Sequence, residues 1–190
     1  MTAITSCPTW LYKQIDVPNL DTIQQELLNV AKCIINDIDT LIPNFHLVLR
    51  EEIDAMLPYA KEYLDELGLL ERWKYLAFIT GNGGTSLPLH VDSTEWEFNA
   101  YGLNIPVLNC KNSFTVFYNA TLSQSIYEST DPRSVAQFCD QDTATEIDRF
   151  EATNPCWVNI CIPHRPEVLH TLPRILASFR FRPELHDVLN

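Results

Sequence analysis

The chain has 190 residues, and its 13 Lys+Arg against 25 Asp+Glu give a formal net charge of −12. Hydrophobic residues make up 46% and charged residues 20%, a balance that is typical of a globular protein and excludes a disordered or fibrous one. The negative charge, with no basic stripe in the sequence, argues against nucleic-acid binding and against binding to an anionic membrane.

No apolar run reaches the length of a membrane span, and residues 1–7 lack a basic region followed by an apolar core. We therefore expect no signal peptide and a cytoplasmic location. The six cysteines include no C-x-x-C pair, which predicts reduced and mostly buried thiols and excludes the usual zinc and thiol-redox signatures.

Helix patterns dominate the first 72 residues. Apolar residues recur at three- and four-residue spacing from Ile23 to Leu41, which predicts an amphipathic helix. A second helical stretch is expected from Arg50 to Leu67, with Pro58 in a first turn and Gly68 at the C-terminal cap. Residues 1–72 are therefore expected to form a mostly helical flank.

Strand patterns follow from residue 73, and turn residues separate them. The polar residues 120–145 are expected to form a long loop or insertion. We predict one domain, 1–190, of mainly β class, in which residues 73–190 form a jelly-roll core with the helices on one face. The expected strands are Trp73–Thr80, Leu87–Val91, Tyr101–Leu108, Phe114–Asn119, Glu146–Ala152, Trp157–Ile162 and Arg174–Phe181.

His90 and Asp92 are the first candidate metal ligands. Side chains alternate along a strand, so these two residues share one face while Leu89 and Val91 share the other. Imidazole nitrogen and carboxylate oxygen form a mixed ligand set that Fe(II), Mn(II) or Zn(II) accepts. Taken alone the H-x-D pattern is weak, because an ordinary polar strand end has the same spacing.

A second set of polar residues near the C-terminus offers a third ligand, for which His164 and His170 are the candidates. Two histidines and one carboxylate on one face make the facial triad of non-haem Fe(II) oxygenases, which leaves positions for substrate and O2. Arg174 offers a fixed cation for a carboxylate. His164 is preferred over His170 as the ligand, because ten residues to Arg174 leave room for a turn; His170 would require another arginine, Arg180.

The order of these segments resembles the Fe(II)/2-oxoglutarate-dependent oxygenases, and in particular their aspartyl/asparaginyl β-hydroxylase-like branch. The resemblance runs from about Trp73 to Phe181 and implies a double-stranded β-helix, or cupin-like jelly roll. It implies Fe(II) as metal, 2-oxoglutarate as cosubstrate and hydroxylation by O2 with release of succinate and CO2. The segments that carry it are His90-Val-Asp92, Leu103-Asn-Ile-Pro106, Thr115-Val-Phe-Tyr118, Pro163-His164 and Arg174.

Carried over residue by residue, the resemblance implies that His90, Asp92 and His164 bind iron and that Arg174 holds the distal carboxylate of 2-oxoglutarate. Asn104, Tyr118 and Ser178 are further candidates for contact with the cosubstrate. Many relatives have Ser or Thr two residues after the arginine, where Leu176 stands, and Ser178 on the same face is its substitute here. For Tyr118, packing beside Phe114 and Val116 is the competing interpretation.

Two other functions fit the same residues. One is a jelly-roll binding module without turnover, and the other is a cupin-like Zn or Mn enzyme of another class. Cupins generally use more histidines, and no further histidine stands beside His90. The substrate is expected to be an amino acid, a peptide or another small molecule, and the helical flank could pair two copies into a homodimer.

Overall fold

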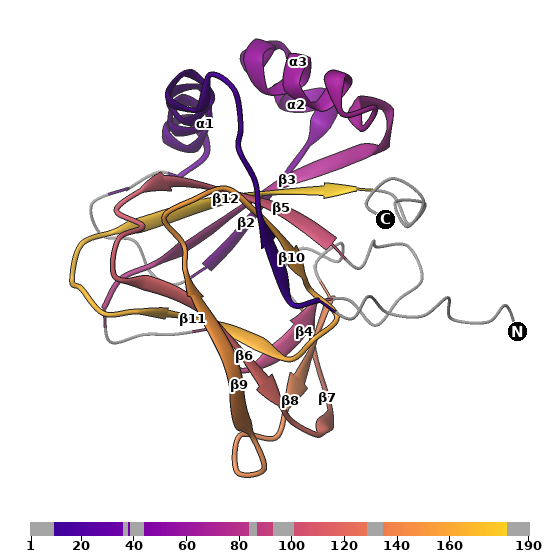
Figure 1. Cartoon of the computed structure of the whole chain (residues 1–190), viewed down its shortest axis with the longest axis vertical. Helices are drawn as coiled ribbons and strands as arrows, with labels where there is room; N and C mark the ends of the chain where they lie inside the picture. The colour runs from indigo at the N-terminus through magenta and orange to yellow at the C-terminus, as the bar shows by residue number, and fades with distance from the viewer. Residues whose placement is uncertain are drawn as a thin grey trace, which may run out of the picture.

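The computed structural model describes residues 10–35, 38, 44–83, 87–92, 101–128 and 135–181. Two antiparallel sheets of six strands face each other, and the helices lie on the outside of one of them (Figure 1). The major sheet has the order β1 (Tyr12–Gln14), β10 (Cys156–Asn159), β5 (Tyr101–Leu108), β12 (Arg174–Phe181), β3 (Trp73–Gly81) and β2 (Asn44–Leu49). The minor sheet has the order β7 (Leu122–Glu128), β8 (Val135–Cys139), β4 (His90–Asp92), β11 (His164–Val168), β6 (Ser113–Asn119) and β9 (Thr145–Glu151).

The chain passes back and forth between the two sheets. Strands β3, β5, β10 and β12 lie in the major sheet, and β4, β6, β9 and β11 in the minor sheet. In each sheet these four strands are neighbours, and along the chain they alternate between the sheets except where β9 follows β6 within the minor sheet. This winding is the double-stranded β-helix, so the predicted fold class is confirmed.

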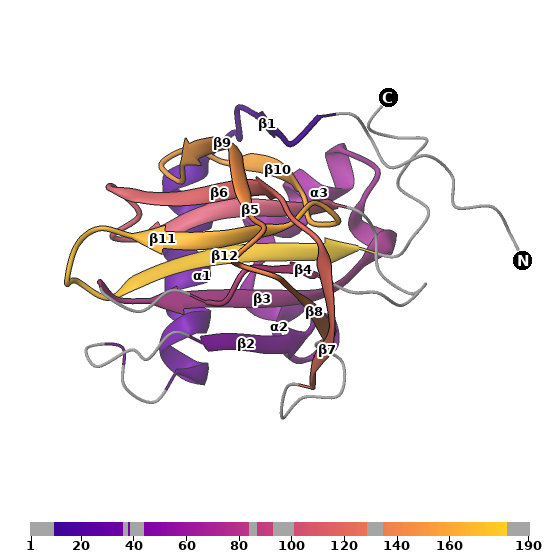
Figure 2. The same ribbon diagram turned by 90° about the horizontal axis from the view of Figure 1, so that it is seen from below.

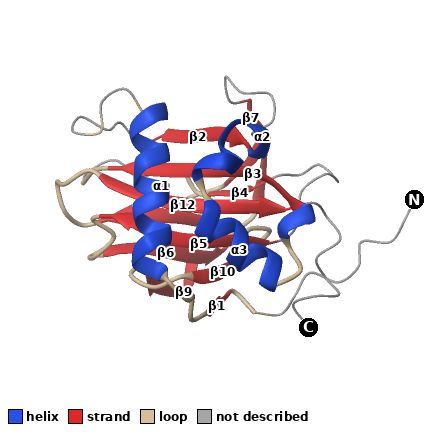
Figure 3. Ribbon diagram, turned by 90° about the horizontal axis from the view of Figure 1, so that it is seen from above, coloured by secondary structure: helices blue, strands red, loops and turns tan. Residues whose placement is uncertain are grey.

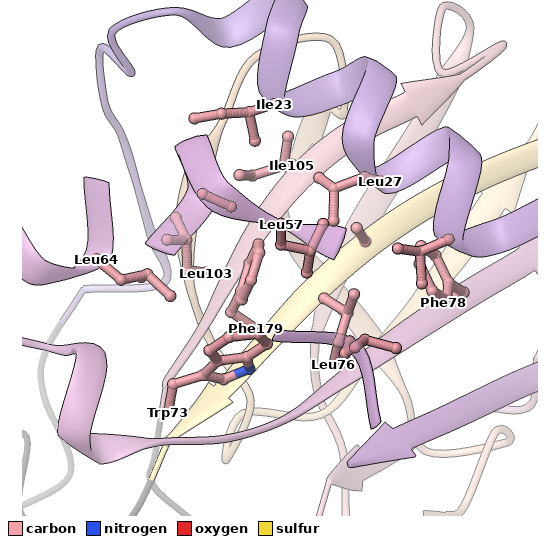
Figure 4. Packing of buried hydrophobic residues seen from close by; sticks show 14 of the residues in the cluster. Ile23, Leu27, Leu57, Leu64, Trp73, Leu76, Phe78, Leu103, Ile105 and Phe179 are labelled. Atoms are coloured by element: carbon pink, nitrogen blue, oxygen red, sulfur yellow. The ribbon is translucent and has the colours of Figure 1, made fainter. Parts of the chain in front are cut away.

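The outer face of the major sheet is covered by α1 (Leu20–Ile34), α2 (Arg50–Ile53) and α3 (Pro58–Glu66), as Figure 3 shows. A short 3₁₀ turn at Asp54–Met56 connects α2 to α3, and a second at Leu70–Arg72 connects α3 to β3. Helix α1 buries Ile23 and Leu27 against the sheet, and the ring of Phe179 lies 5.4 Å from that of Trp73 (Figure 4). Alternation along β12 places its apolar residues in this layer: Ile175, Ala177, Phe179 and Phe181.

The opposite face of β12 points between the sheets. There Leu176 joins a second apolar cluster with Phe117 and Val158, whereas the remaining inward positions of β12 hold Arg174, Ser178 and Arg180. All three polar side chains are buried. One strand therefore contributes apolar packing on its outer face and polar groups on its inner face.

The N-terminal flank contains the expected helices and also two strands. Pro58 begins α3, and Gly68 follows its last residues with a φ of 68°, both as predicted. The described part of the first helix ends at Ile34, before the predicted end at Leu41, and residues 39–41 lie outside the described residues. Residues 44–49 form β2, which pairs with β3 at one edge of the major sheet.

Two segments differ from the predicted loops. Within residues 120–145 the chain forms β7 and β8, which pair with each other and extend the minor sheet beside β4 (Figure 2). A turn was expected between His164 and Arg174, but His164 is the first residue of a further strand, β11. Pro166 argues against a strand in the sequence, because proline has no N–H to donate to a neighbouring strand. In the structure only His164 of β11 pairs with β4, so the N–H that Pro166 lacks leaves no hydrogen bond to β4 unmade.

No helix of the described residues is long and apolar enough to cross a membrane.

Candidate metal centre

Strands β4 and β11 bring two histidines together. Their pairing places His164 directly opposite His90, and the two ring centroids are 4.8 Å apart. Asp92 follows two residues after His90, on the same face of β4. One ligand atom from each of these three residues lies within 4.8 Å of the other two, so they could hold a metal ion.

Each histidine has one ring nitrogen already fixed. His90 Nδ1 lies 2.6 Å from the Pro88 carbonyl oxygen, and His164 Nδ1 lies 2.8 Å from that of Ile162. A carbonyl oxygen only accepts, so both Nδ1 atoms carry the proton and donate it. In the neutral rings Nε2 then keeps its lone pair, which is the condition for binding a metal.

Asp92 completes the triad and is held by a cation. Its Oδ1 lies 3.1 Å from His90 Nε2, and its Oδ2 accepts a hydrogen bond of 2.7 Å from Arg180 Nη2. Burial would raise the pKa of Asp92, but Arg180 and the two histidines outweigh burial and hold that pKa well below its ordinary value. The carboxylate is therefore ionised at neutral pH and available as a ligand.

The two histidines titrate differently. Burial, together with the nearby His90, lowers the pKa of His164 to about 4, so this imidazole is neutral at physiological pH. Burial also acts to lower the pKa of His90, but the hydrogen bond and the charge of Asp92 outweigh it and the pKa is raised. A proton therefore competes with a metal more strongly at His90 than at His164.

Arg174 lies in the same cavity, and no described residue is a partner for its charge. Its side chain is 1% exposed, and none of its three guanidinium nitrogens has a hydrogen-bond partner among the described residues. Burial lowers its pKa, an effect that the neighbouring Cys110 opposes. An arginine remains charged even so, and a buried cation without a partner is costly unless an anion binds to it.

The polar residues of the cavity come from both sheets. Apolar side chains, among them Ile79, Val158 and Leu176, make up much of the remaining wall. Asp92 is the one acidic residue that lines the cavity within the described ranges. The polar lining consists of His90, Asp92, Asn104, Thr115, His164, Arg174 and Arg180.

Of the other predicted residues, Asn104 and Ser178 lie close to this cavity. They are opposite one another on β5 and β12, and Ser178 Oγ donates a hydrogen bond of 2.6 Å to Asn104 Oδ1. Asn104 lines the cavity itself, and Ser178 stands behind it and fixes its amide oxygen. The amide nitrogen of Asn104 is therefore turned away from Ser178 and remains free to donate elsewhere.

Tyr118 and His170 lie elsewhere. Tyr118 packs with Leu89 and Val91, and the guanidinium of Arg165 lies 5.1 Å from the centre of its ring, so the structure does not bring Tyr118 into the cavity. His170 Nε2 is bound to the Asn109 carbonyl oxygen at 2.8 Å, outside the triad. The described geometry thus groups His164, and not His170, with His90 and Asp92.

From the sequence, Arg180 was expected only as a substitute for Arg174, and its contact with Asp92 was not predicted. The alternation of β12 placed Arg180 on the inward face, but the two residues are 88 positions apart and lie in different sheets. No local pattern could join them. Thr115 is a second residue of the cavity that the sequence left unassigned, although it opens the Thr115–Tyr118 segment.

Chemically, the cavity offers two imidazole nitrogens and one carboxylate oxygen on one side. On the other it offers the guanidinium of Arg174, which has no partner in the described part of the chain. Such a ligand set suits a divalent transition metal and leaves part of its coordination sphere open. The guanidinium suits a carboxylate in a two-point contact. A dianion that chelates the metal at one end and meets Arg174 at the other would satisfy both groups.

No family model and no curated protein matches this sequence. Among solved structures, a prolyl-4-hydroxylase from Pseudomonas putida is similar with 11% identity and a TM-score of 0.48, covering 93% of this chain and 94% of its own. HygX from Streptomyces hygroscopicus, solved with nickel and 2-oxoglutarate, has 10% identity and a TM-score of 0.47 over 91% of this chain and 82% of its own.

Oxalate decarboxylase from Bacillus subtilis, a protein with Mn(II) centres, is similar at 9% identity and a TM-score of 0.38. The match covers 80% of this chain but 29% of the decarboxylase, so the chain spans less than a third of that protein. The structural neighbours thus include a prolyl-4-hydroxylase, a protein solved with nickel and 2-oxoglutarate, and an oxalate decarboxylase with Mn(II) centres. At this level of similarity they do not identify a reaction, which has to be inferred from the site itself.

Proposed function

We propose that the protein is an Fe(II)- and 2-oxoglutarate-dependent dioxygenase that hydroxylates a small-molecule, amino-acid or peptide substrate in the cytoplasm. The observation that carries the proposal is Arg174, a buried guanidinium without a partner among the described residues, in one cavity with a His-Asp-His triad. A metal triad alone fits many enzymes. A buried unpaired cation beside it calls for an anionic cosubstrate.

His90, Asp92 and His164 would hold the metal through Nε2, a carboxylate oxygen and Nε2. Bound there, Fe(II) supplies the redox chemistry by which O2 oxidises 2-oxoglutarate and the substrate. The residues around the triad prepare its ligands. The carbonyl oxygens of Pro88 and Ile162 fix the ring orientations, and Arg180 keeps Asp92 ionised.

Arg174 would bind the distal carboxylate of 2-oxoglutarate and so orient the keto acid end toward the triad. Asn104, whose oxygen is fixed by Ser178, can donate its amide protons to the cosubstrate, and Thr115 adds a hydroxyl on the opposite sheet. The apolar wall that includes Ile79, Val158 and Leu176 excludes water and strengthens these charged contacts.

The substrate class comes from the sequence resemblance to the aspartyl/asparaginyl β-hydroxylase-like branch. That branch includes enzymes that act on amino-acid residues or on free amino acids, and we propose the same class here. The presence of Asp92 favours hydroxylation, because halogenating relatives lack this carboxylate.

The proposal is tested by anaerobic titration of the Fe(II)-loaded full-length protein with 2-oxoglutarate. Chelation of the cosubstrate should produce a weak visible metal-to-ligand charge-transfer band. In Arg174→Met the band should require a much higher 2-oxoglutarate concentration while the iron content stays unchanged, since Arg174 does not contact the triad. Arg165→Met, which removes an arginine from beside Tyr118, is the matched control and should leave the titration unaltered.

Each other outcome points to one of the rival functions. Bound iron without a charge-transfer band would indicate a metal enzyme of another class, such as a cupin-like Zn or Mn enzyme. Absence of metal binding would indicate a binding module without turnover.

A further inference from the structure

Asp92 has its two carboxylate oxygens directed to different partners. Oδ2 accepts a hydrogen bond of 2.7 Å from Arg180 Nη2, while Oδ1 lies 3.1 Å from His90 Nε2, toward the triad. Two ligand atoms that share a metal at right angles are separated by about 3 Å when each bond is about 2.1 Å long. Oδ1 therefore stands at ligand distance from His90 Nε2, whereas Oδ2, which lies 4.0 Å from His164 Nε2, already accepts the hydrogen bond from Arg180.

Arg180 is fixed in this place by its surroundings. The residue is 4% exposed, and its guanidinium lies 5.9 Å from the centre of the Phe45 ring. Gly102 is its partner on β5, and a Cβ there would come within 3.3 Å of Arg180 Cζ and Nη1. Glycine thus leaves the room that the guanidinium occupies, so Arg180 reaches Asp92 as part of the packed interior.

From this geometry we propose that Arg180 is a positioning residue that restricts Asp92 to binding a metal through one oxygen. The inference rests on the metal centre of the proposed function. A carboxylate can bind a metal with one oxygen or with both. Because Arg180 occupies Oδ2 with a charge-assisted hydrogen bond, rotation of the carboxylate to present both oxygens would break that bond and leave a buried guanidinium unpaired.

Binding of Asp92 through one oxygen, and not two, determines how many coordination positions of the metal stay open. In a six-coordinate centre the facial triad leaves about three positions open. A cosubstrate that chelates with two atoms leaves one position for O2. If Asp92 bound with both oxygens, the triad and the cosubstrate together would fill every position, so O2 would have no site. Arg180 thus preserves the position on which oxygenation depends.

Arg174 provides an internal control for this role. It lies on the same inward face of β12, lines the same cavity and is equally buried, but it makes no contact with Asp92. A purely electrostatic effect of a buried cation on the metal would be expected from either arginine. Restriction of Asp92 to one oxygen is expected from Arg180 only.

The experiment counts water molecules on the metal. The full-length protein is loaded with Mn(II), and the paramagnetic relaxation of water protons reports how many waters are bound. About three waters are expected in the native protein, from six positions less three protein ligands. Arg180→Met should lose one of them, a fall in relaxivity of about one third, whereas Arg174→Met should keep the native value. Arg180→Lys, which can still donate to Oδ2, should restore it.

These counts are made without 2-oxoglutarate, so they do not depend on the cosubstrate. Subsequent addition of 2-oxoglutarate should displace two waters from the native centre; if it displaces none, the proposed function fails while the test of Arg180 stands. Retention of the native water count in a folded, Mn(II)-loaded Arg180→Met would overturn the role of Arg180. So would loss of Mn(II) binding in both Arg180 variants, because Arg180 would then be needed for any binding by Asp92.

Discussion

The two faces of β12 differ in polarity, although both are buried. The outer face, with Phe179 and its apolar neighbours, packs under the helices, whereas the inner face carries Arg174, Ser178 and Arg180 into the cavity. Both faces are buried to a similar degree. The difference is therefore not one of solvent exposure but of what each buried group does for the folded state.

Burial of the outer face stabilises the fold, and burial of the inner face costs stability. An apolar ring such as Phe179 gains free energy when it leaves water. A guanidinium such as Arg174 loses its hydration and gains no protein partner among the described residues, so its burial is unfavourable in the ligand-free protein. Buried polar groups on only one face of the strand, with their unfavourable free energy, are consistent with a binding site on that face.

The largest expected effect concerns the metal ligands. Removal of a ligand's hydrogen-bond partner typically weakens metal binding 10- to 100-fold, so loss of the ligand itself in Asp92→Ala or His164→Ala should weaken it at least about 1000-fold. Metal affinity of the purified variants, measured by competition with a chelator, tests this. His170→Ala is the control, and an equal loss in that variant would contradict the assignment of His164.

On the outer face, truncation should affect stability and leave the site intact. Phe179→Ala removes a ring that packs against Trp73, and we expect a loss of about 3–5 kcal/mol in the free energy of unfolding. Denaturant unfolding measures this loss. Metal affinity below the transition should stay within about twofold of the native value, since additive effects are expected for separated sites; a large fall would show that the two faces are coupled.

Much of the framework of this site was readable in the sequence. The predicted strand Arg174–Phe181 has the same ends as β12, and Ser178 was placed on the same face as Arg174. The H-x-D spacing placed His90 and Asp92 on one face, and a third ligand was expected at His164, which the structure places opposite His90. Each of these inferences depends on residues within one strand or on the order of segments.

The features that escaped prediction depend on contacts between distant segments. The bond between Arg180 and Asp92 joins two sheets. Strand β11 was not predicted, because proline disfavours a strand interior and the sequence does not show that pairing with β4 ends before Pro166. The polar residues 122–139 showed no apolar alternation, since β7 and β8 are held largely by pairing with each other and with β4. Sequence patterns therefore predict which side chains are buried better than they predict which strands pair.

Replacement of Arg174 by an apolar residue should stabilise the ligand-free protein. Arg174→Met keeps the volume and the apolar stem but removes the unpaired charge, so the free energy of unfolding should rise by about 1–4 kcal/mol, the range found when buried ionic groups are exchanged for apolar ones. Thermal and denaturant unfolding without metal or 2-oxoglutarate test this. Destabilisation instead would show that Arg174 contributes to the fold, and the contrast between the faces of β12 would be lost.

The smallest effect is the pH dependence that His164 imposes on the metal-free protein. Its pKa is about 4 in the folded state, against an ordinary value of 6.5, so between these values the unfolded chain binds more protons than the folded one. The free energy of unfolding should therefore fall as the pH is lowered from 6.5 toward 4. At pH 6 the contribution is about 1 kcal/mol relative to pH 8. His164→Asn should lack this component, whereas the opposing contribution of His90, whose pKa is raised, remains in both proteins. NMR titration of the His164 ring checks the cause directly, and a ring that protonates near pH 6.5 would remove it.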